Sequence, residues 1–339
     1  MMASHLQERA HLRRGFTGTG WFVILVVLAS LHFMPWVMPE HVHIMIMTLL
    51  FAAMGQGWNI LGGYAGQFSF GHSVFFGLGA YTSTLLYIHA GLTPWVGMVC
   101  ACVMGMVLGL SIGFLSFRYG LRGPFFALIM LAFAEIFHMI AMGWPAVGAS
   151  HGLLIPLKGN SVAALQFTTK EPFYFMALWM MVGTLYLAWR LERTRTGLYF
   201  LAVREDHEAA EALGVDTFKS QMVAMALSAG ITSTAGTIYA QYLLYIDPDS
   251  TFGLLNSVEI MVRPIIGGPG TVLGPLLGSA VLTPLAEVTR LAFQSYSGVY
   301  LMWYGLILMV VIIFLPNGLM GLIYQLMEKI RKKSKRNDE

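Results

Sequence analysis

Charge is scarce in this sequence. Charged side chains make up 11% of the 339 residues, whereas hydrophobic side chains make up 57%. A soluble globular domain carries about 25% charged residues. So few charges leave too little polar surface to cover a globule in water, so most of the surface must face lipid. The same scarcity leaves no folded basic face for a nucleic acid.

The motifs of catalytic and metal sites are also lacking. The two cysteines, Cys100 and Cys102, lie two residues apart in one apolar run, so on a helix they point to different faces. The ten histidines show no zinc-ligand spacing. The sequence holds no GxxxxGK[ST] phosphate loop. We therefore expect no catalytic residue, metal or cofactor in this chain, and any ATP-driven step requires another subunit.

Long apolar runs are what the sequence has instead, and about 20 such residues span a bilayer. The runs that are long enough lie near 21–38, 43–61, 70–90, 95–117, 124–143, 173–191, 221–245 and 300–316. A longer stretch, 256–293, is interrupted by glycines and a proline at 267–270, so it is either two short spans or a re-entrant hairpin. These runs predict an all-α membrane protein, a polytopic bundle of 8–10 transmembrane helices with glycine-rich broken or re-entrant segments.

The basic residues predict the orientation of the spans. Lys and Arg are concentrated at both ends of the chain and in two of the loops, as expected on a cytoplasmic side. Both termini are therefore predicted to be cytoplasmic, and parity allows eight spans with a re-entrant element or ten, but not nine. The predicted organisation is a basic N-terminus (1–20), a transmembrane domain (21–317) that contains a cytoplasmic loop (192–220), and a basic tail (318–339).

Ionisable residues within the runs are candidates for function because burying them in a membrane is costly. Glu135 lies three residues before His138, and Glu259 lies four residues before Arg263, so each pair shares a helix face. Two interpretations remain open for Glu259 and Arg263. They form a structural ion pair between helices, or they form a gate or line the translocation path.

The segment NILGGYAGQFSFGHSVFFGLGAY, residues 59–81, is a glycine-rich polar break between apolar runs. Its backbone must be buried in protein or line a water-filled cavity, because lipid offers no hydrogen bonds. Broken helices of this kind often form substrate sites. Asn59, Gln67, Ser69 and His72 are therefore candidate residues of a translocation path, and a plain cytoplasmic turn is the alternative.

A short helix is predicted in the polar loop AVREDHEAAEALGVDTFKSQ, residues 202–221. Asp206 is an N-cap residue, Glu208 falls in the first turn, and Gly214 suits the left-handed residue that ends a helix. A helix this short is not stable alone, so we expect it to be ordered by docking against a partner.

Three segments carry a family resemblance. Glu208-Ala209-Ala210 followed by Gly214 resembles the EAA-type loop of binding-protein-dependent ABC importer permeases. The chain resembles more closely the LivM-type permeases of branched-chain amino acid importers, over about 45 to 320. The segments that carry the resemblance are 59–81, 197–216 and 257–280.

The resemblance implies a function and partners. It implies a permease subunit of the bacterial inner membrane that moves branched-chain or other small amino acids by alternating access. The partners would be two ABC ATPase subunits, which use ATP and Mg²⁺, a second homologous permease and a periplasmic solute-binding protein. The residues implied to couple to the ATPase are Arg204, Glu208, Ala209, Ala210 and Gly214.

The sequence also allows three other functions. Related permeases with the same motifs carry urea or short amides. A different class is an ion-coupled secondary transporter, in which the chain works alone with Glu135 or Glu259 as the proton or cation site. An integral-membrane enzyme ranks last, because no paired carboxylates or nucleophile–base set falls at one membrane depth.

Overall fold

The computed structural model describes residues 30–293 and separate residues between 298 and 325, which include the helical stretch 318–323. The chain divides near His43 into two units, and every site discussed below lies in the second, which begins at Ile44. In the first unit, residues 30–37 are helical and a short 3-10 turn, η1, spans Pro39–His41. The predicted basic N-terminus lies outside the described residues, as do most of the predicted span 300–316 and of the basic tail.

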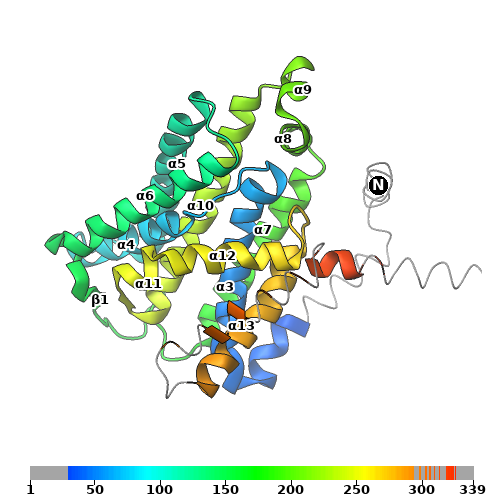
Figure 1. Cartoon of the computed structure of the whole chain (residues 1–339). Coiled ribbons are helices and arrows are strands. Elements are labelled where there is room, and N and C mark those ends of the chain that lie inside the picture. The colour runs from blue at the N-terminus through cyan, green and yellow to red at the C-terminus, as the bar shows by residue number, and fades with distance from the viewer. Residues whose placement is uncertain are drawn as a thin grey trace, which may run out of the picture. The chain divides into compact units, whose positions relative to one another are not determined.

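Helices dominate the second unit, and the all-α class is confirmed (Figure 1). The α-helices are α3 (Val42–Trp58), α4 (Ser73–His89), α5 (Pro94–Arg118), α6 (Pro124–Gly143), α7 (Glu171–Leu191), α8 (Arg195–Glu205), α9 (His207–Ala212), α10 (Thr217–Leu243), α11 (Pro248–Phe252), α12 (Leu254–Gly267) and α13 (Gly274–Ala292). A π-helix, η2 (Asn59–Tyr64), extends α3, and two 3-10 turns, η3 (Pro145–Val147) and η4 (Ala149–His151), follow α6.

Six predicted spans coincide with helices to within a few residues. Five helical runs of the described part are long and apolar enough to cross a membrane. They are the run 39–64 that contains α3 and η2, and the helices α5, α6, α7 and α10. The sixth is α4, which has 17 residues and falls slightly short of the roughly 20 that a perpendicular crossing needs.

Helix ends follow local sequence signals. Pro94 and Pro124 each stand in the first turn of a helix, where the missing N–H removes no hydrogen bond. Asp216 caps α10 by accepting a hydrogen bond from the Lys219 N–H at 2.9 Å. The chain leaves α10 at Leu244 in the left-handed conformation. These signals set the helix lengths independently of the membrane.

Helix α10 lies at the centre and packs closely on α4 and α5. Small residues make this approach possible: a Cβ atom added at Gly109 of α5 would lie 2.7 Å from the Ala229 Cβ of α10. Hydroxyl groups of α10 also bond to the α4 backbone, with Ser233 Oγ donating to the Phe75 carbonyl at 2.9 Å. Consequently α10 is mostly buried, whereas α5 turns most of its surface outward.

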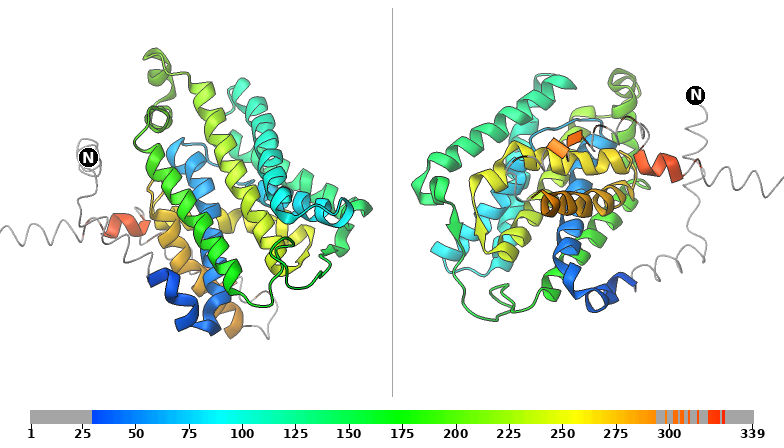
Figure 2. Two further views of the ribbon diagram at one scale, coloured as in Figure 1. Left: turned by 180° about the vertical axis from the view of Figure 1, so that it is seen from behind. Right: turned by 60° about the horizontal axis from the view of Figure 1, so that its bottom comes forward.

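The predicted broken stretch 256–293 is a helical hairpin. Its helices α12 and α13 lie side by side and are joined by the loop 268–273 (Figure 2). With 14 residues, α12 is about 21 Å long at 1.5 Å per residue, so it is too short to cross the hydrocarbon core. In Figure 1, α12 runs across the direction of α7 and α10.

Two short strands join the segment after α6 to the far end of α10. Strand β1 (Leu153–Leu154) pairs antiparallel with β2 (Tyr245–Ile246), and Leu153 stands opposite Ile246. Figure 1 shows β1 and the α8–α9 loop at opposite ends of α10. The second unit therefore presents two distinct ends, and α8 and α9 belong to the end where α10 begins.

Candidate functional site

The connection from α7 to α10 consists of two helices, α8 and α9, which are separated by a break in the helical backbone at Asp206. Asp206 is extended, and its Oδ1 accepts a hydrogen bond from the Ala209 N–H at 3.0 Å, which caps α9. Glu208 lies in the first turn, and Gly214 has a φ of +83° just after the helix. The cap and the helix end predicted from the sequence are confirmed. The preceding helix α8, which contains Arg204, had no sequence signal strong enough to predict it.

The residues of the predicted ATPase-coupling loop do not share one face. Glu208, Ala209 and Gly214 are exposed, whereas Ala210 is buried. Leu213, which the sequence reading did not single out, is 85% exposed at the end of α9. The end of α9 therefore presents one apolar side chain to solvent beside exposed acidic residues.

Polar side chains of α9 attach this helix to the first residue of α10. The Thr217 hydroxyl donates to the Glu211 carboxylate at 2.7 Å, and this bond is the main reason that the pKa of Glu211 is lowered. His207 Nε2 lies 3.2 Å from the same carboxylate. Partial burial, and next the charge of Arg122, lower the pKa of His207. Glu211 thus holds α9 against α10, while Leu213 and Gly214, the tip of α9, stay exposed.

Arg204 points away from this exposed tip and into the chain. Its Nη1 donates to the Gly63 carbonyl at 2.5 Å, across 141 residues of sequence. Gly63 lies near the end of η2, where the chain leaves the helix and its carbonyl groups lack helical partners. The structure therefore places Arg204 against the first glycine break, apart from the other predicted coupling residues.

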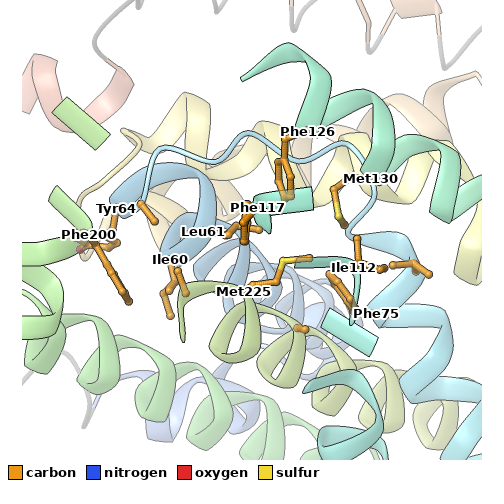
Figure 3. Packing of buried hydrophobic residues seen from close by; sticks show 14 of the residues in the cluster. Ile60, Leu61, Tyr64, Phe75, Ile112, Phe117, Phe126, Met130, Phe200 and Met225 are labelled. Carbon is orange, nitrogen blue, oxygen red and sulfur yellow. The ribbon is translucent and has the colours of Figure 1, made fainter. Parts of the chain in front are cut away.

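An apolar cluster attaches α8 to the same break. Ile60 and Leu61 of η2 pack in one buried cluster with Phe200 of α8 and Met225 of α10 (Figure 3). At its edge the Tyr64 hydroxyl donates to the Glu192 carboxylate at 2.8 Å. Sequence reasoning missed these contacts, because Phe200 and Tyr64 are ordinary apolar residues until the fold brings them together.

The two glycine breaks contact each other through Asn59. The Asn59 side chain accepts a hydrogen bond from the Gly270 N–H at 2.7 Å and donates to the Thr271 carbonyl at 2.9 Å. Asn59 is fully buried, and Gly270 has a φ of +72°. One amide thus satisfies two backbone groups of the loop 268–273. The sequence marked Asn59 as unusual but gave no sign of its partner.

The other polar residues of the first break are buried beside α10. His72 Nδ1 lies 2.9 Å from the Ser69 hydroxyl, and His72 Nε2 lies 2.7 Å from the Ser228 hydroxyl. Gln67 is also buried, with its Nε2 3.5 Å from the Ala65 carbonyl. These residues are packed within the protein, which agrees with the requirement that this backbone avoid lipid. Their role in a translocation path stays a prediction.

Glu135 belongs to a separate cluster between α6 and α11. Its carboxylate lies 3.7 Å from His138 Nδ1, and His138 Nε2 lies 2.9 Å from the Asp249 carboxylate. The prediction that Glu135 and His138 share a helix face is confirmed. The Glu135 side chain is 52% exposed on this chain, so it is not enclosed with the residues of the first break.

Glu259 and Arg263 form the predicted pair. Arg263 Nη2 lies 3.2 Å from the Glu259 carboxylate, and Arg263 is 1% exposed. Its Nε lies 3.4 Å from the Thr283 hydroxyl of α13, and its guanidinium stands 3.7 Å from the centre of the Phe51 ring. These contacts offset part of the cost of burying the charge. They tie α12 to α13 and α3, whereas the gating interpretation stays a prediction.

The described residues thus form a bundle of long apolar helices in which two glycine-rich breaks contact each other, with a short exposed helix at one end. The family described as branched-chain amino acid transport system, permease component, matches residues 38–316. The chain belongs to this family, and it is a permease component of ABC-type transport. No solved structure matches the chain.

Similar curated proteins carry two kinds of name. The high-affinity branched-chain amino acid transport system permease protein LivM of Salmonella typhimurium is 27% identical over 88% of this chain and 73% of its own length. LivM of Escherichia coli K12 is 26% identical over 82% and 69%. The autoinducer 2 import system permease protein LsrC of Yersinia pestis is 26% identical over 62% and 65%.

Proposed function

We propose that this chain is the permease subunit of an ABC importer that carries branched-chain or other small amino acids across the bacterial inner membrane. The observation that carries the proposal is the family match over residues 38–316. The LivM relatives support the amino acid specificity. The short helix α9 supports the ABC mechanism, because its exposed tip offers a soluble subunit a place to dock.

The proposed complex contains two ABC ATPase subunits, a second homologous permease and a periplasmic solute-binding protein. The ATPases would bind and hydrolyse ATP with Mg²⁺, since this chain has no phosphate loop. Both termini and the α8–α9 loop would lie on the cytoplasmic side. The Lys and Arg residues at the chain ends and beside α8 support this orientation.

The proposed mechanism is alternating access. ATP binding would close the ATPase pair, displace α9 and rearrange the helices so that solute enters from the binding protein and leaves inside. The candidate path residues are Asn59, Gln67, Ser69, His72, Glu135, Glu259 and Arg263. The four residues of the first break are buried in the described conformation, so this mechanism requires the break to open.

Two measurements test the proposal: co-purification of the ATPase subunits and uptake of the solute. The tagged chain is expressed in the cells that it comes from, and two quantities are measured: the ATPases that elute with it and the uptake of labelled L-leucine. Glu208→Arg should release the ATPases and lower uptake about tenfold, because it reverses a charge at the docking surface. Glu205→Arg, at an exposed position in α8, is the matched control. If no ATPase elutes with the unmodified chain, the ABC proposal is wrong.

The LsrC relatives support a second candidate solute, autoinducer 2. Competition separates the candidates: unlabelled L-leucine, L-alanine, urea and autoinducer 2 are each added in excess to the uptake assay. The ion-coupled alternative predicts that uptake stops when the proton gradient is collapsed and depends on Glu135 or Glu259. Arg263→Ala with normal uptake would exclude the gating role of the Glu259–Arg263 pair.

A further inference from the structure

The α8–α9 loop and both glycine breaks meet at one place, and Arg204 stands in the middle of it. Its guanidinium bonds to the Gly63 carbonyl of the first break at 2.5 Å. A Cβ atom added at Gly270 of the second break would lie 2.6 Å from Arg204 Nη1 and 2.9 Å from the Gly63 carbonyl oxygen. The Arg204 side chain therefore touches two segments that are about 200 residues apart in the chain.

The chemistry of the contact suits an arginine. The Gly63 carbonyl lies near the C-terminal end of a helix, where partial negative charge accumulates and a cation is stabilising. Arg keeps its charge at every physiological pH and presents several N–H donors in a fixed plane. Lys retains the charge but lacks the planar fork, so it is a partial substitute.

Glycines around Arg204 give the contact its tightness. Gly66 has a φ of +71°, and a Cβ atom there would lie 3.1 Å from the Arg204 Cα. A Cβ at Gly63 would lie 2.6 Å from the Gly270 N. The backbones of α8, η2 and the loop 268–273 thus lie in direct contact, with little free space to absorb a displacement.

Asn59 completes the connection. It bonds to Gly270 and Thr271 of the second break, so the two breaks move together if either is displaced. At the start of the same loop, Gly268 lies against the segment 318–323, where an added Cβ would come within 3.0 Å of the Met320 Cβ. A movement of α8 would therefore reach η2, the hairpin α12–α13 and the segment 318–323.

We propose that Arg204 is a positioning residue that transmits movement of the α8–α9 loop to the two glycine breaks. This inference rests on the proposed function, in which an ATPase moves α9. It assigns Arg204 a role different from that of Glu208, Ala209 and Gly214. Those three residues contact the ATPase subunit, and Arg204 transmits the movement to the two glycine breaks. Arg204 acts through the backbone of the breaks and touches no solute.

Hydrogen–deuterium exchange tests whether Arg204 connects α8 to the two glycine breaks, and it does not require the ATPase subunits. Arg204→Ala should make the amides of 59–72 and 268–273 exchange about tenfold faster, because a charged hydrogen bond to the break is lost. Arg204→Lys should restore most of the protection. Arg195→Ala, an exposed arginine of the same helix, is the matched control and should leave both segments unchanged. Equal exchange in Arg204→Ala and Arg195→Ala would overturn the proposal.

Transport measurements on the complex with its ATPase subunits test the role. Arg204→Ala should retain the ATPases and their ATP hydrolysis but lower L-leucine uptake per ATP hydrolysed about tenfold. Glu208→Arg should instead lose the ATPases. If Arg204→Ala releases the ATPases as Glu208→Arg does, Arg204 belongs to the docking surface and the proposal is wrong. Normal coupling in Arg204→Ala also overturns it.

Arg204→Lys keeps the proposal testable if Arg204→Ala does not fold. If Arg204→Ala elutes as an aggregate, Arg204→Lys must still show an intermediate uptake per ATP at unchanged ATPase binding. Wild-type coupling in that variant would then count against the proposal. The proposed function fails in a different way, because no ATPase would elute with the unmodified chain, while the exchange test of Arg204 would stand.

Discussion

The exposed tip of α9, formed by Leu213 and Gly214, lies within ten residues of Arg204. Arg204 belongs to the junction where α8 meets Asn59 and the glycines of the two breaks. The two regions differ in their burial and in how closely they are packed. At the tip, Leu213 is 85% exposed and an added Cβ at Gly214 meets nothing within 4 Å. At the junction, Asn59 is fully buried and a Cβ atom added at Gly63 or Gly270 would lie 2.6 Å or less from its neighbours. Shortening the Leu213 side chain at the tip should change binding with little change in stability, whereas a substitution at the junction should change stability first.

The largest effect on stability is expected from Asn59→Leu. Leucine fills a similar volume but leaves the Gly270 N–H and the Thr271 carbonyl without their partner. Two buried backbone groups without hydrogen bonds cost about 2–6 kcal/mol together. Thermal unfolding in detergent should show a large fall in Tm. The control is Asn256→Leu, a less buried asparagine that bonds to the Ser250 carbonyl; an equal fall there would show that the junction is not special.

A matched pair of glycines comes next. Gly270 and Gly214 both have positive φ, at +72° and +83°, so alanine adds a backbone strain of about 1 kcal/mol at either position. Only at Gly270 would the new Cβ collide, with Arg204 Nη1 at 2.6 Å. Gly270→Ala should therefore lower the free energy of unfolding by about 1–3 kcal/mol more than Gly214→Ala. Similar values for the two would contradict a tightly packed junction.

Acid should loosen α9 and spare the junction. The pKa of Glu211 is lowered, so its stabilisation holds above its ordinary pKa and is lost as the pH falls through the folded-state value. The pKa of His207 is also lowered, so protonation below its ordinary pKa near 6.5 favours the undocked helix. Both effects destabilise α9 as the pH falls.

Exchange protection of the α9 amides, corrected for the intrinsic rate, measures the His207 part of this loosening between pH 7.5 and 5, whereas the Glu211 part follows only below the ordinary glutamate pKa of 4.5. The protection of residues 59–64 should stay constant, because the Asn59 amide and the Arg204 guanidinium do not titrate there. His207→Gln should remove the part of the α9 response that begins below the ordinary histidine pKa of 6.5. Equal acid responses in α9 and in 59–64 would show that the two regions are not independent.

The smallest effect on stability is expected from Leu213→Ala. Because this side chain is already in contact with water, the free energy of unfolding should change by less than about 0.5 kcal/mol. The binding of the ATPase subunits should nevertheless weaken, since an exposed apolar residue gains its stabilisation only in a complex. Ala212→Ser, also exposed on α9 and outside the predicted coupling residues, is the control. An unchanged ATPase yield in Leu213→Ala would place the docking contact elsewhere.

The spans and caps were predictable because their causes are local. Six apolar runs became helices near their predicted limits, and Asp206 and Gly214 begin and end α9 as their side-chain chemistry predicts. The Glu259–Arg263 and Glu135–His138 pairs were also visible, because each lies within one helical turn. Helix α8 was missed because its composition is mixed and its order comes from packing of Phe200.

By itself the sequence determined that this protein is a multi-pass helical membrane protein, since hydropathy, proline positions and capping residues act within a turn or two of the chain. The permease function came from the resemblance of three segments to a known family. Only the tertiary structure decided that Arg204 turns inward and that Asn59 bonds to the second break. Those contacts join residues 141 and 211 positions apart, and nothing in the local chemistry of Arg204 or Asn59 names a partner. The partner is fixed when α10, η2 and the α12–α13 hairpin pack together and leave one carbonyl and one loop in need of hydrogen bonds.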